Sequence, residues 1–425
     1  MKNDTITPMS GLSSQPYKGT RDWYPEDKAV QNYIFETWKK TVRAFGYQEY
    51  GAPLLEPLEV YTAKSGDELA NEQTYAFRDR GDREVAIRPE MTPSISRMVA
   101  ARRQELAYPA RLFSIANFMR YERPQRGRER EFWQLNIDTF GDDSIAADAE
   151  VLQLADTILT SFGADSSMYE IRLNDRRLIN QLTQEYLGLD EDQSRALVRL
   201  IDRKNKLPGD VFEESARELL GAERADNLRQ VLSAQNFDEL PRELAESDAA
   251  RDVRELLELV RELGVETIRF DVTLMRGLEY YTGTVFEVFD TDPENNRSLF
   301  GGGRYDGLVG LFGVEPVSAV GFAPGLTTTE LFLRSHNLLP DLKLGVDIYL
   351  ASLGDTVRDT LRYAQTLRAS GLHVEVDTTG RKTDKLFRAA EKKGATEIVF
   401  VGSNEVDSGV YTAKNLTTGE TRTLS

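Results

Sequence analysis

The spacing of apolar residues changes several times along the chain, and each pattern predicts a different element. An apolar residue at every fourth position predicts a helix over 26–45, with Gly46 after its end and with the stripe Val30, Ile34, Trp38 and Val42. Residues 111–119 and 132–140 are rich in apolar side chains and flank a charged stretch without core-forming residues. That arrangement predicts two antiparallel strands joined by a long exposed loop.

The central part of the chain alternates between strand-like and helical patterns. Residues 85–99 predict a strand and then a helix, and 146–162 predicts a further helix. From about 175 to 262 the chain is rich in Leu, Glu, Arg, Asp and Ala at helical spacing, which predicts a helical insertion. Beyond it, the triple glycine 301–303 suits a simple turn or a phosphate cradle, and 317–333 predicts a buried strand, a Gly-rich turn and a helix.

Residues 343–425 have the pattern of a separate α/β domain. Three short apolar strands alternate with two helical segments, an order that predicts a small doubly wound sheet. This stretch holds twelve Lys and Arg and eleven Asp and Glu, a formal charge of +1 against −18 for the rest. The predicted fold class is α+β, with an antiparallel-sheet domain over 1–335 that carries the insertion and this smaller domain after it.

Composition narrows the chemistry. The 425-residue chain has a formal net charge of −17, so any binding of nucleic acid must come from local basic patches. It has no cysteine and only two histidines, which excludes disulfides and thiolate metal sites and argues against a His-based zinc site or a Ser-His-Asp triad. Neither a secretory h-region nor a run of roughly 20 apolar residues is visible, so we expect a cytoplasmic protein without a membrane partner.

The charged loop between the two predicted strands holds five arginines within eleven residues: Arg120, Arg123, Arg126, Arg128 and Arg130. Such a loop is either a solvated hairpin tip or a site for anions, because the planar guanidinium donates hydrogen bonds to phosphate in pairs. Gly127 lets backbone approach a ligand closely, and Phe132 and Gln134 share one face of the second strand. These two details favour phosphate binding.

Two motifs identify a family resemblance. The run RYERPQRGRER-EFWQ resembles motif 2 of the class II aminoacyl-tRNA synthetases in its histidyl-tRNA synthetase form, and LMRGLEYYTGTVFEV resembles that family's histidine-binding signature. Residues 26–57 resemble motif 1, although an ordinary helix–strand pair has the same pattern, and 317–333 has the shape of motif 3. The resemblance spans nearly the whole chain. It implies a class II catalytic domain, a C-terminal anticodon-binding domain and a homodimer through motif 1.

The resemblance also implies which residues bind L-histidine. Glu90, Met91 and Thr92 match a Pro-Glu-x-Thr loop that binds the α-amino group, for which a carboxylate is the suitable partner. Asp138 and Tyr281 match the positions that meet the two imidazole nitrogens; position 138 is often Glu in bacterial members, and Asp is one methylene shorter. The remaining matches are Arg120, Gln134, Arg276, Tyr280 and Tyr305.

For ATP, the resemblance implies two catalytic arginines on the α-phosphate, Arg120 and Arg276, although a structural salt bridge is the other interpretation of an isolated Arg276. Glu122 and Phe132 match the positions that bind and stack the adenine, and Arg128 matches one that meets the γ-phosphate. Joining two anions requires neutralised charge rather than proton transfer, so arginines and Mg²⁺ suffice and no metal site of the protein's own is expected.

The sequence departs from the family at motif 3. The usual Glu-Arg after Gly-Leu is replaced by Thr327-Thr328, and the next basic residue, Arg334, is six positions further on. The geometry of the ATP site is therefore not predicted by the motif at this point.

Two basic regions are candidates for contacts with tRNA(His). Arg123 and Gln125 lie in the motif 2 loop, where they suit the reading of an identity base. The second helix of the C-terminal domain places basic residues on one face, which is either a solvated surface or a phosphate-binding one: Arg381, Lys385, Arg388 and Lys392. The insertion reaches toward the tRNA acceptor stem in the resembled family, and a helical spacer fits its pattern equally well.

The predicted activity is ATP-dependent ligation of L-histidine to tRNA(His) through a histidyl-adenylate. One alternative is the family's non-catalytic paralogue, the regulatory subunit of ATP phosphoribosyltransferase in histidine biosynthesis; another is an RNA-binding or regulatory protein that kept the fold without the chemistry. The altered motif 3 favours the paralogue. The matches at Arg120, Gln134 and Arg276 and the presence of a C-terminal domain favour the enzyme.

Overall fold

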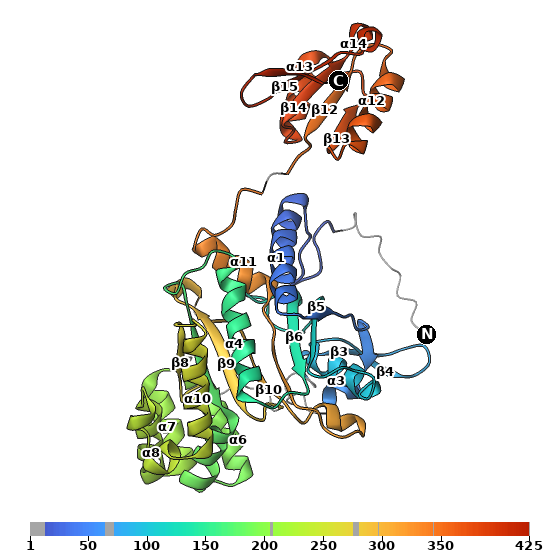
Figure 1. Cartoon of the computed structure of the whole chain (residues 1–425). Helices are drawn as coiled ribbons and strands as arrows, with labels where there is room; N and C mark the ends of the chain where they lie inside the picture. Colours follow the sequence, from blue (N-terminus) through green and yellow to red (C-terminus); the bar gives the residue numbers. More distant parts are fainter. Residues whose placement is uncertain are drawn as a thin grey trace, which may run out of the picture. The chain divides into compact units, whose positions relative to one another are not determined.

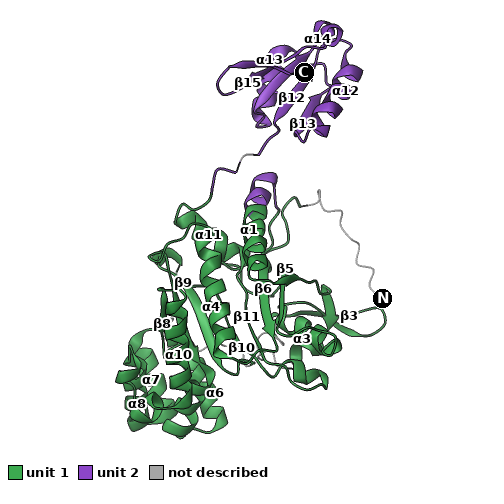
Figure 2. Cartoon of the chain, viewed as in Figure 1, with its two compact units in different colours: residues 1–22, 31–339 green, residues 23–30, 340–425 purple. Residues whose placement is uncertain are grey.

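The computed structural model describes residues 13–63, 72–204, 207–274, 280–295, 297–342 and 344–424. The chain divides into two compact units, which Figure 2 colours separately. The larger unit comprises residues 1–22 and 31–339, and the smaller comprises residues 23–30 and 340–425. Within the described residues, no helix combines the length and the apolar character that a membrane crossing requires.

An eight-stranded sheet forms the centre of the larger unit (Figure 1). Its strands, in spatial order, are β1 (Gln48–Glu49), β5 (Ala110–Met119), β6 (Glu131–Phe140), β11 (Ala319–Phe322), β10 (Ser298–Arg304), β9 (Thr284–Asp290), β7 (Tyr169–Asp175) and β8 (Ile268–Phe270). The pairings are antiparallel except at the two edges, where β1 joins β5 and β8 joins β7 in parallel. The predicted hairpin around the Arg-rich loop is confirmed: β5 and β6 pair from Ala110 with Phe140 to Met119 with Glu131.

Helices α1 (Pro25–Ala44) and α4 (Ile145–Thr160) pack beside this sheet (Figure 1). The predicted stripe of α1 is buried at Ile34, Trp38 and Val42, and the Phe35 ring lies 5.5 Å from the Trp133 ring of β6. Gly46 follows the helix with φ +81°, the left-handed conformation that glycine adopts without strain. The stripe therefore packs on the chain's own core.

A smaller sheet and two helices complete the larger unit. Strands β2 (Leu55–Pro57), β4 (Glu84–Ile87) and β3 (Tyr75–Arg78) form an antiparallel sheet in that order, and α2 (Glu59–Thr62) follows β2. The predicted strand and helix of 85–99 are β4 and α3 (Thr92–Ala101). The predicted strand, turn and helix of 317–333 are β11 and α11 (Leu326–Ser335).

The triple glycine lies inside β10, so the interpretation as a turn or a phosphate cradle is wrong. A Cβ atom on Gly302 would come within 2.2 Å of the Gly321 carbonyl oxygen, and one on Gly303 within 2.3 Å of the Thr284 carbonyl oxygen. These glycines therefore allow close packing within the sheet rather than a loop conformation. Short 3₁₀ turns flank the strand, at Pro293–Asn295 and Val309–Phe312.

The insertion is helical, as its composition predicts, and lies at the lower left of Figure 1. Its helices are α5 (Arg176–Asn180), a π-helical turn (Gln181–Tyr186), α6 (Glu191–Asp202), α7 (Gly209–Leu220), α8 (Ala222–Ser233), a 3₁₀ turn (Phe237–Glu239), α9 (Arg242–Ala245) and α10 (Asp248–Glu262). Asp175, the last residue of β7, caps α5 by accepting a hydrogen bond from the Arg177 amide. Leu256, Leu257 and Val260 line the buried face of α10.

The smaller unit is built on the sheet order β13-β12-β14-β15-β16. The predicted βαβαβ core is present as β12 (Ile348–Ser352), α12 (Val357–Ala369), β13 (Val374–Asp377), α13 (Thr383–Lys392) and β14 (Glu397–Val401), with parallel pairing. The sequence patterns missed α14 (Ser403–Ser408) and the hairpin β15 (Tyr411–Asn415) and β16 (Thr421–Leu424), which extends the sheet antiparallel. Their apolar residues are too few to give a strand signal.

The predicted basic helix face needs one correction. Helix α13 begins at Thr383, so Arg381 precedes it, and its guanidinium lies 3.8 Å from the Asp377 carboxylate. Lys385, Arg388 and Lys392 are on the helix and exposed.

Candidate active site

Strand β6 positions the side chains that the sequence assigns to the amino acid. Phe132, Gln134 and Asp138 stand at even positions on one face, since side chains alternate along a strand. Asp138 is buried, and Gln134 is bridged to Gly325 at the start of α11. Gly321 of β11 provides the space that the Asp138 side chain needs, because a Cβ at position 321 would lie 2.7 Å from Asp138 Oδ1.

Asp138 has an incomplete set of hydrogen bonds. Tyr305 Oη donates to its Oδ1, whereas its buried Oδ2 has no partner. Burial, opposed by the Tyr305 hydrogen bond, raises the pKa of Asp138 to about 7. A buried acceptor without a donor is costly, so this carboxylate suits a ligand that brings an N–H group.

Three tyrosines surround this carboxylate. The Tyr280 and Tyr281 rings are 5.0 Å apart, the Tyr280 and Tyr305 rings 5.8 Å apart, and all three side chains are buried. Tyr280 Oη donates to Glu90 Oε2 at 3.3 Å. The structure thus joins Glu90, Tyr280, Tyr305 and Asp138 in one polar-edged aromatic wall, although they come from four separate parts of the sequence.

The Pro-Glu-x-Thr segment lies where β4 ends and α3 begins. Met91 is buried against Phe118. Thr92 is the first residue of α3, and the residue at the N-cap position, Met91, makes no side-chain capping hydrogen bond. Arg120 reaches this segment: its Nε donates to the Pro89 carbonyl at 2.9 Å, and its guanidinium lies 5.2 Å from the Phe132 ring centre. Arg120, Phe132 and the Glu90 loop are therefore neighbours.

The Arg-rich loop folds back on itself. Arg128 forms an ion pair with Glu122 at 2.7 Å. The family resemblance implies that Glu122 binds the adenine and Arg128 the γ-phosphate, so these two candidate residues contact each other in this structure. Arg130 is buried between the Tyr17 hydroxyl, at 2.9 Å, and the Tyr121 ring, at 4.2 Å, which gives it a structural role. Arg123 and Gln125 are exposed in the same loop.

A cavity of about 280 Å³ lies between this loop and α11. Its walls include Arg126, Gly127, Arg297, Thr328 and Leu331. Thr328 Oγ1 donates to the Leu299 carbonyl at 2.8 Å, so the residue in the motif 3 position stabilises the junction with β10. Arg334 is turned to Glu330, at 2.8 Å, on its own helix and is not part of the wall.

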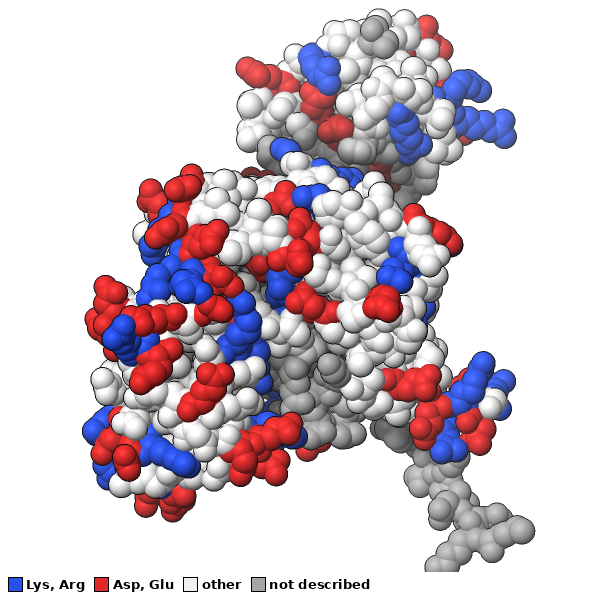
Figure 3. All heavy atoms as spheres, turned by 60° about the horizontal axis from the view of Figure 1, so that its bottom comes forward, with Lys and Arg blue, Asp and Glu red and all other residues white. Residues whose placement is uncertain are grey.

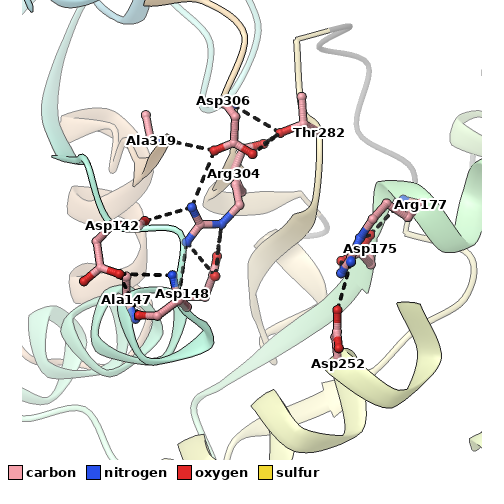
Figure 4. A network of polar contacts seen from close by, with 11 residues as sticks. Asp142, Ala147, Asp148, Asp175, Arg177, Asp252, Thr282, Arg304, Asp306 and Ala319 are labelled. Atoms are coloured by element: carbon pink, nitrogen blue, oxygen red, sulfur yellow. Dashed lines mark hydrogen bonds and ion pairs between the residues drawn. The ribbon is translucent and has the colours of Figure 1, made fainter. Parts of the chain in front are cut away.

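A network behind the tyrosines holds them in place, and the sequence reasoning missed it. Figure 4 shows the buried Arg304 between Asp148 and Asp306. Arg304 Nη2 donates to Asp148 at 2.8 Å and Nη1 to the Asp142 carbonyl at 2.9 Å, while Thr282 Oγ1 donates to Asp306 at 3.0 Å. Thr282 and Asp306 directly follow Tyr281 and Tyr305. The Arg-Tyr-Asp run after the glycines was the available signal, because a charged residue inside a sheet core needs a buried partner.

A second missed residue supports the Glu90 loop. Arg88 is buried, and its Nε and Nη1 donate to the carbonyls of Asn117, at 2.9 Å, and Ala52, at 2.8 Å. Burial lowers the pKa of the Arg88 guanidinium. The Arg88 side chain links the end of β4 to β5. In the sequence, this role is indicated only by the position of an arginine directly before Pro89-Glu90.

Some assigned residues lie elsewhere. Arg276 falls outside the described residues, so the structure does not place it. Lys385, Arg388 and Arg381 belong to the smaller unit. Across the described ranges, no group of three or more His, Cys, Asp or Glu side chains could hold a metal ion.

Two family models match the chain. The family model described as histidyl-tRNA synthetase matches residues 19–328, and the anticodon binding domain matches 347–425. A histidine–tRNA ligase of Leptospira biflexa is 39% identical over 418 residues, 97% of this chain and 96% of that protein.

Solved structures share the fold. The histidyl-tRNA synthetase of Nostoc sp. PCC 7120 has a TM-score of 0.81 at 23% identity, covering 98% of this chain and 97% of that one. A Bacillus halodurans protein described as an ATP phosphoribosyltransferase regulatory subunit/histidyl-tRNA synthetase has a TM-score of 0.76 at 25% identity, covering 92% and 98%. The family model alone spans well over half of the sequence, and the chain belongs to the histidyl-tRNA synthetase family.

Proposed function

We propose that the protein ligates L-histidine to tRNA(His) at the expense of ATP, in the cytoplasm, through a histidyl-adenylate. The observation that carries the proposal is the Asp138–Tyr305 pair. Asp138 Oδ2 is buried and accepts no hydrogen bond within the described residues, and the tyrosines around it also contact Glu90. An amino acid with an N–H-bearing ring and an ammonium group matches both ends of this wall.

Histidine recognition follows from the chemistry of that wall. The imidazole N–H donates to Asp138, and Tyr281 provides the partner for the other ring nitrogen. Glu90 binds the α-amino group with Met91 and Thr92 beside it, and Gln134 orients the amino end. Because buried polar groups would stay unpaired, the pocket rejects phenylalanine and leucine.

Activation joins the histidine carboxylate to the α-phosphate of ATP. Arg120 lies between the Glu90 loop and the Phe132 ring, so it suits a contact with both the carboxylate and the α-phosphate. Arg276 provides the second charge at that phosphate. Phe132 stacks on the adenine, and Glu122 and Arg128 exchange their mutual ion pair for contacts with the nucleotide. Mg²⁺ arrives with the ATP phosphates, which supply oxygen ligands of the kind it prefers.

Contacts with tRNA require local basic groups, because the whole chain is acidic. On the face that Figure 3 draws, acidic and basic side chains are interspersed, which favours short-range contacts over a broad attractive field. Arg123 and Gln125 are exposed and suit the acceptor end. The smaller unit, which matches the anticodon binding domain, offers Arg381, Lys385 and Arg388.

We also propose a homodimer through residues 26–57. The buried stripe of α1 is occupied by the chain's own core, so it does not argue for a partner. The apolar surface in this region is instead at Leu54 and Leu55, which are 45% and 48% exposed, with Phe77 at 48% on the same small sheet. Leu55 and Phe77 stand on the two outer strands of one three-stranded sheet, and apolar surface of this kind is typical of interfaces.

The regulatory-subunit alternative has less support. The chain carries a segment matching the anticodon binding domain, which a subunit without contact to tRNA does not need. The deciding experiment is histidine-dependent exchange of pyrophosphate into ATP. Exchange with histidine and not with phenylalanine supports the ligase. Binding of histidine without exchange would favour the regulatory subunit. Binding of neither substrate would favour a protein that kept only the fold.

A further inference from the structure

The wall of the cavity beside the Arg-rich loop includes the guanidinium of Arg297. At about 280 Å³ it is near the lower end of the volumes of small-ligand sites. Arg126 and Arg297 face Glu294 around it, so arginines outnumber the carboxylate in the wall. Gly127, which has no side chain, and Thr328, which has a small one, leave backbone and space for a ligand. The surroundings suit an anion.

The arginines of this region differ in what they bind. Arg128 is paired with Glu122 at 2.7 Å, and Arg126 contacts both Glu294 and Asn295 at 3.3 Å. Throughout the described part of the chain, no hydrogen bond or ion pair engages the Arg297 guanidinium. Burial first, and repulsion from Arg128 second, lower the pKa of Arg297, and the attraction of Glu122 opposes them only in part. Two neighbouring guanidinium groups thus repel each other, and an anion between them relieves that repulsion.

Helix α11 gives this cavity no charge. Thr328 turns its hydroxyl to the carbonyls of Leu299 and Gly325, at 2.8 and 3.0 Å, and Arg334 is paired with Glu330. Among the described residues that line the cavity, the charged side chains outside the Arg-rich loop are Glu294 and Arg297, which lie just before β10. We propose that Arg297 binds the β- and γ-phosphates of ATP and provides the positive charge that an arginine of α11, replaced here by Thr328, would otherwise provide. This rests on the proposed function.

The experiment compares Arg297→Ala, Arg297→Lys and a control, Arg229→Ala. Arg229 is an exposed arginine of α8 that forms an ion pair with Asp226, at 3.0 Å. Direct binding of ATP and of AMP is measured by calorimetry, and pyrophosphate exchange gives KM values for ATP and histidine. A charge-assisted contact predicts that Arg297→Ala weakens ATP binding about 10- to 100-fold while AMP binding and the KM for histidine stay unchanged. Arg297→Lys should keep part of the affinity, and Arg229→Ala all of it.

The outcomes separate this proposal from the ligase function. If the parental protein binds ATP but shows no histidine-dependent exchange, the proposed function fails, and calorimetry still tests Arg297. Parental ATP affinity in Arg297→Ala overturns the proposal, and so does an equal loss for AMP and ATP. Restored ATP affinity in Arg297→Ala/Thr328→Arg supports it further, because Thr328 faces the same cavity.

Discussion

The hydroxyl of Tyr305 donates to the carboxylate of Asp138 although the two residues are 167 positions apart in the sequence. The contact leaves the other carboxylate oxygen buried and without a donor. Burial makes the ionised form expensive, which raises the pKa of Asp138 from 3.8 to about 7.

Asp138→Asn should alter the pH dependence of stability. Between the unfolded pKa of 3.8 and the folded pKa of about 7, the folded protein binds one more proton than the unfolded chain. The contribution of Asp138 to the parental free energy of unfolding therefore falls by about 1.4 kcal/mol per pH unit as pH rises through this window, and this contribution is level above it. Asn does not titrate, so the free energy of unfolding of the variant should rise relative to that of the parent between pH 5 and 7. Urea unfolding at several pH values measures the difference; parallel curves would mean that Asp138 is ionised throughout.

Asp138→Ala should raise the KM for histidine more than it lowers the exchange rate. The imidazole contact is present in both the ground state and the transition state, so its loss weakens binding uniformly. Steady-state exchange at varied histidine concentration provides the measurement. Tyr33→Phe, a change on α1 where the Tyr33 ring lies 5.8 Å from the Phe162 ring, is a control. A large fall in kcat with an unchanged KM would contradict this role.

Arg120→Ala should slow adenylate formation by about 10²–10³-fold, and Arg276→Ala should do the same. Charge builds on the α-phosphate in the transition state, so a preorganised donor there acts on the rate rather than on histidine affinity. Rapid-quench measurement of a single turnover isolates this step. Adenylate formation at the parental rate in either variant would make that arginine a structural residue.

Arg304→Ala should destabilise the protein by about 3–5 kcal/mol. The change leaves the buried Asp148 without its ion-pair partner, at 2.8 Å in the parent, and frees the turn that holds Tyr305. Denaturant unfolding measures the loss, and the exposed pair of Arg195 and Glu191 provides a matched control in Arg195→Ala. A loss below about 1 kcal/mol, the level of a surface ion pair, would show that the network is not needed.

Removal of residues 343–425 should leave histidine activation largely intact and weaken the charging of tRNA. The core of the smaller unit, formed by residues such as Leu350, Ala364 and Val399, is internal to that unit. The double variant Lys385→Ala/Arg388→Ala should weaken charging in the same direction and reduce its salt dependence, since phosphate contacts release counterions. Charging by the truncated protein at the parental level would exclude the anticodon role.

The sequence by itself determined the local elements and the type of chemistry. Val30 to Val42 repeat every fourth residue, the two apolar runs around the Arg-rich loop alternate, and the C-terminal strands are short and apolar, so helix α1, the β5–β6 hairpin and the βαβαβ core were all predictable. These features depend on neighbours within a few residues, which periodicity reports directly.

Only the tertiary structure decided which of these groups meet. Three glycines that resemble a turn lie inside β10, because Gly321 and Thr284 on neighbouring strands approach too closely for a Cβ. The partners of Asp138, Glu90 and Arg304 come from strands and turns that the sheet order, and not the chain order, brings together. Burial, and with it the pKa of Asp138, is set by this packing, and no pattern within a strand encodes it.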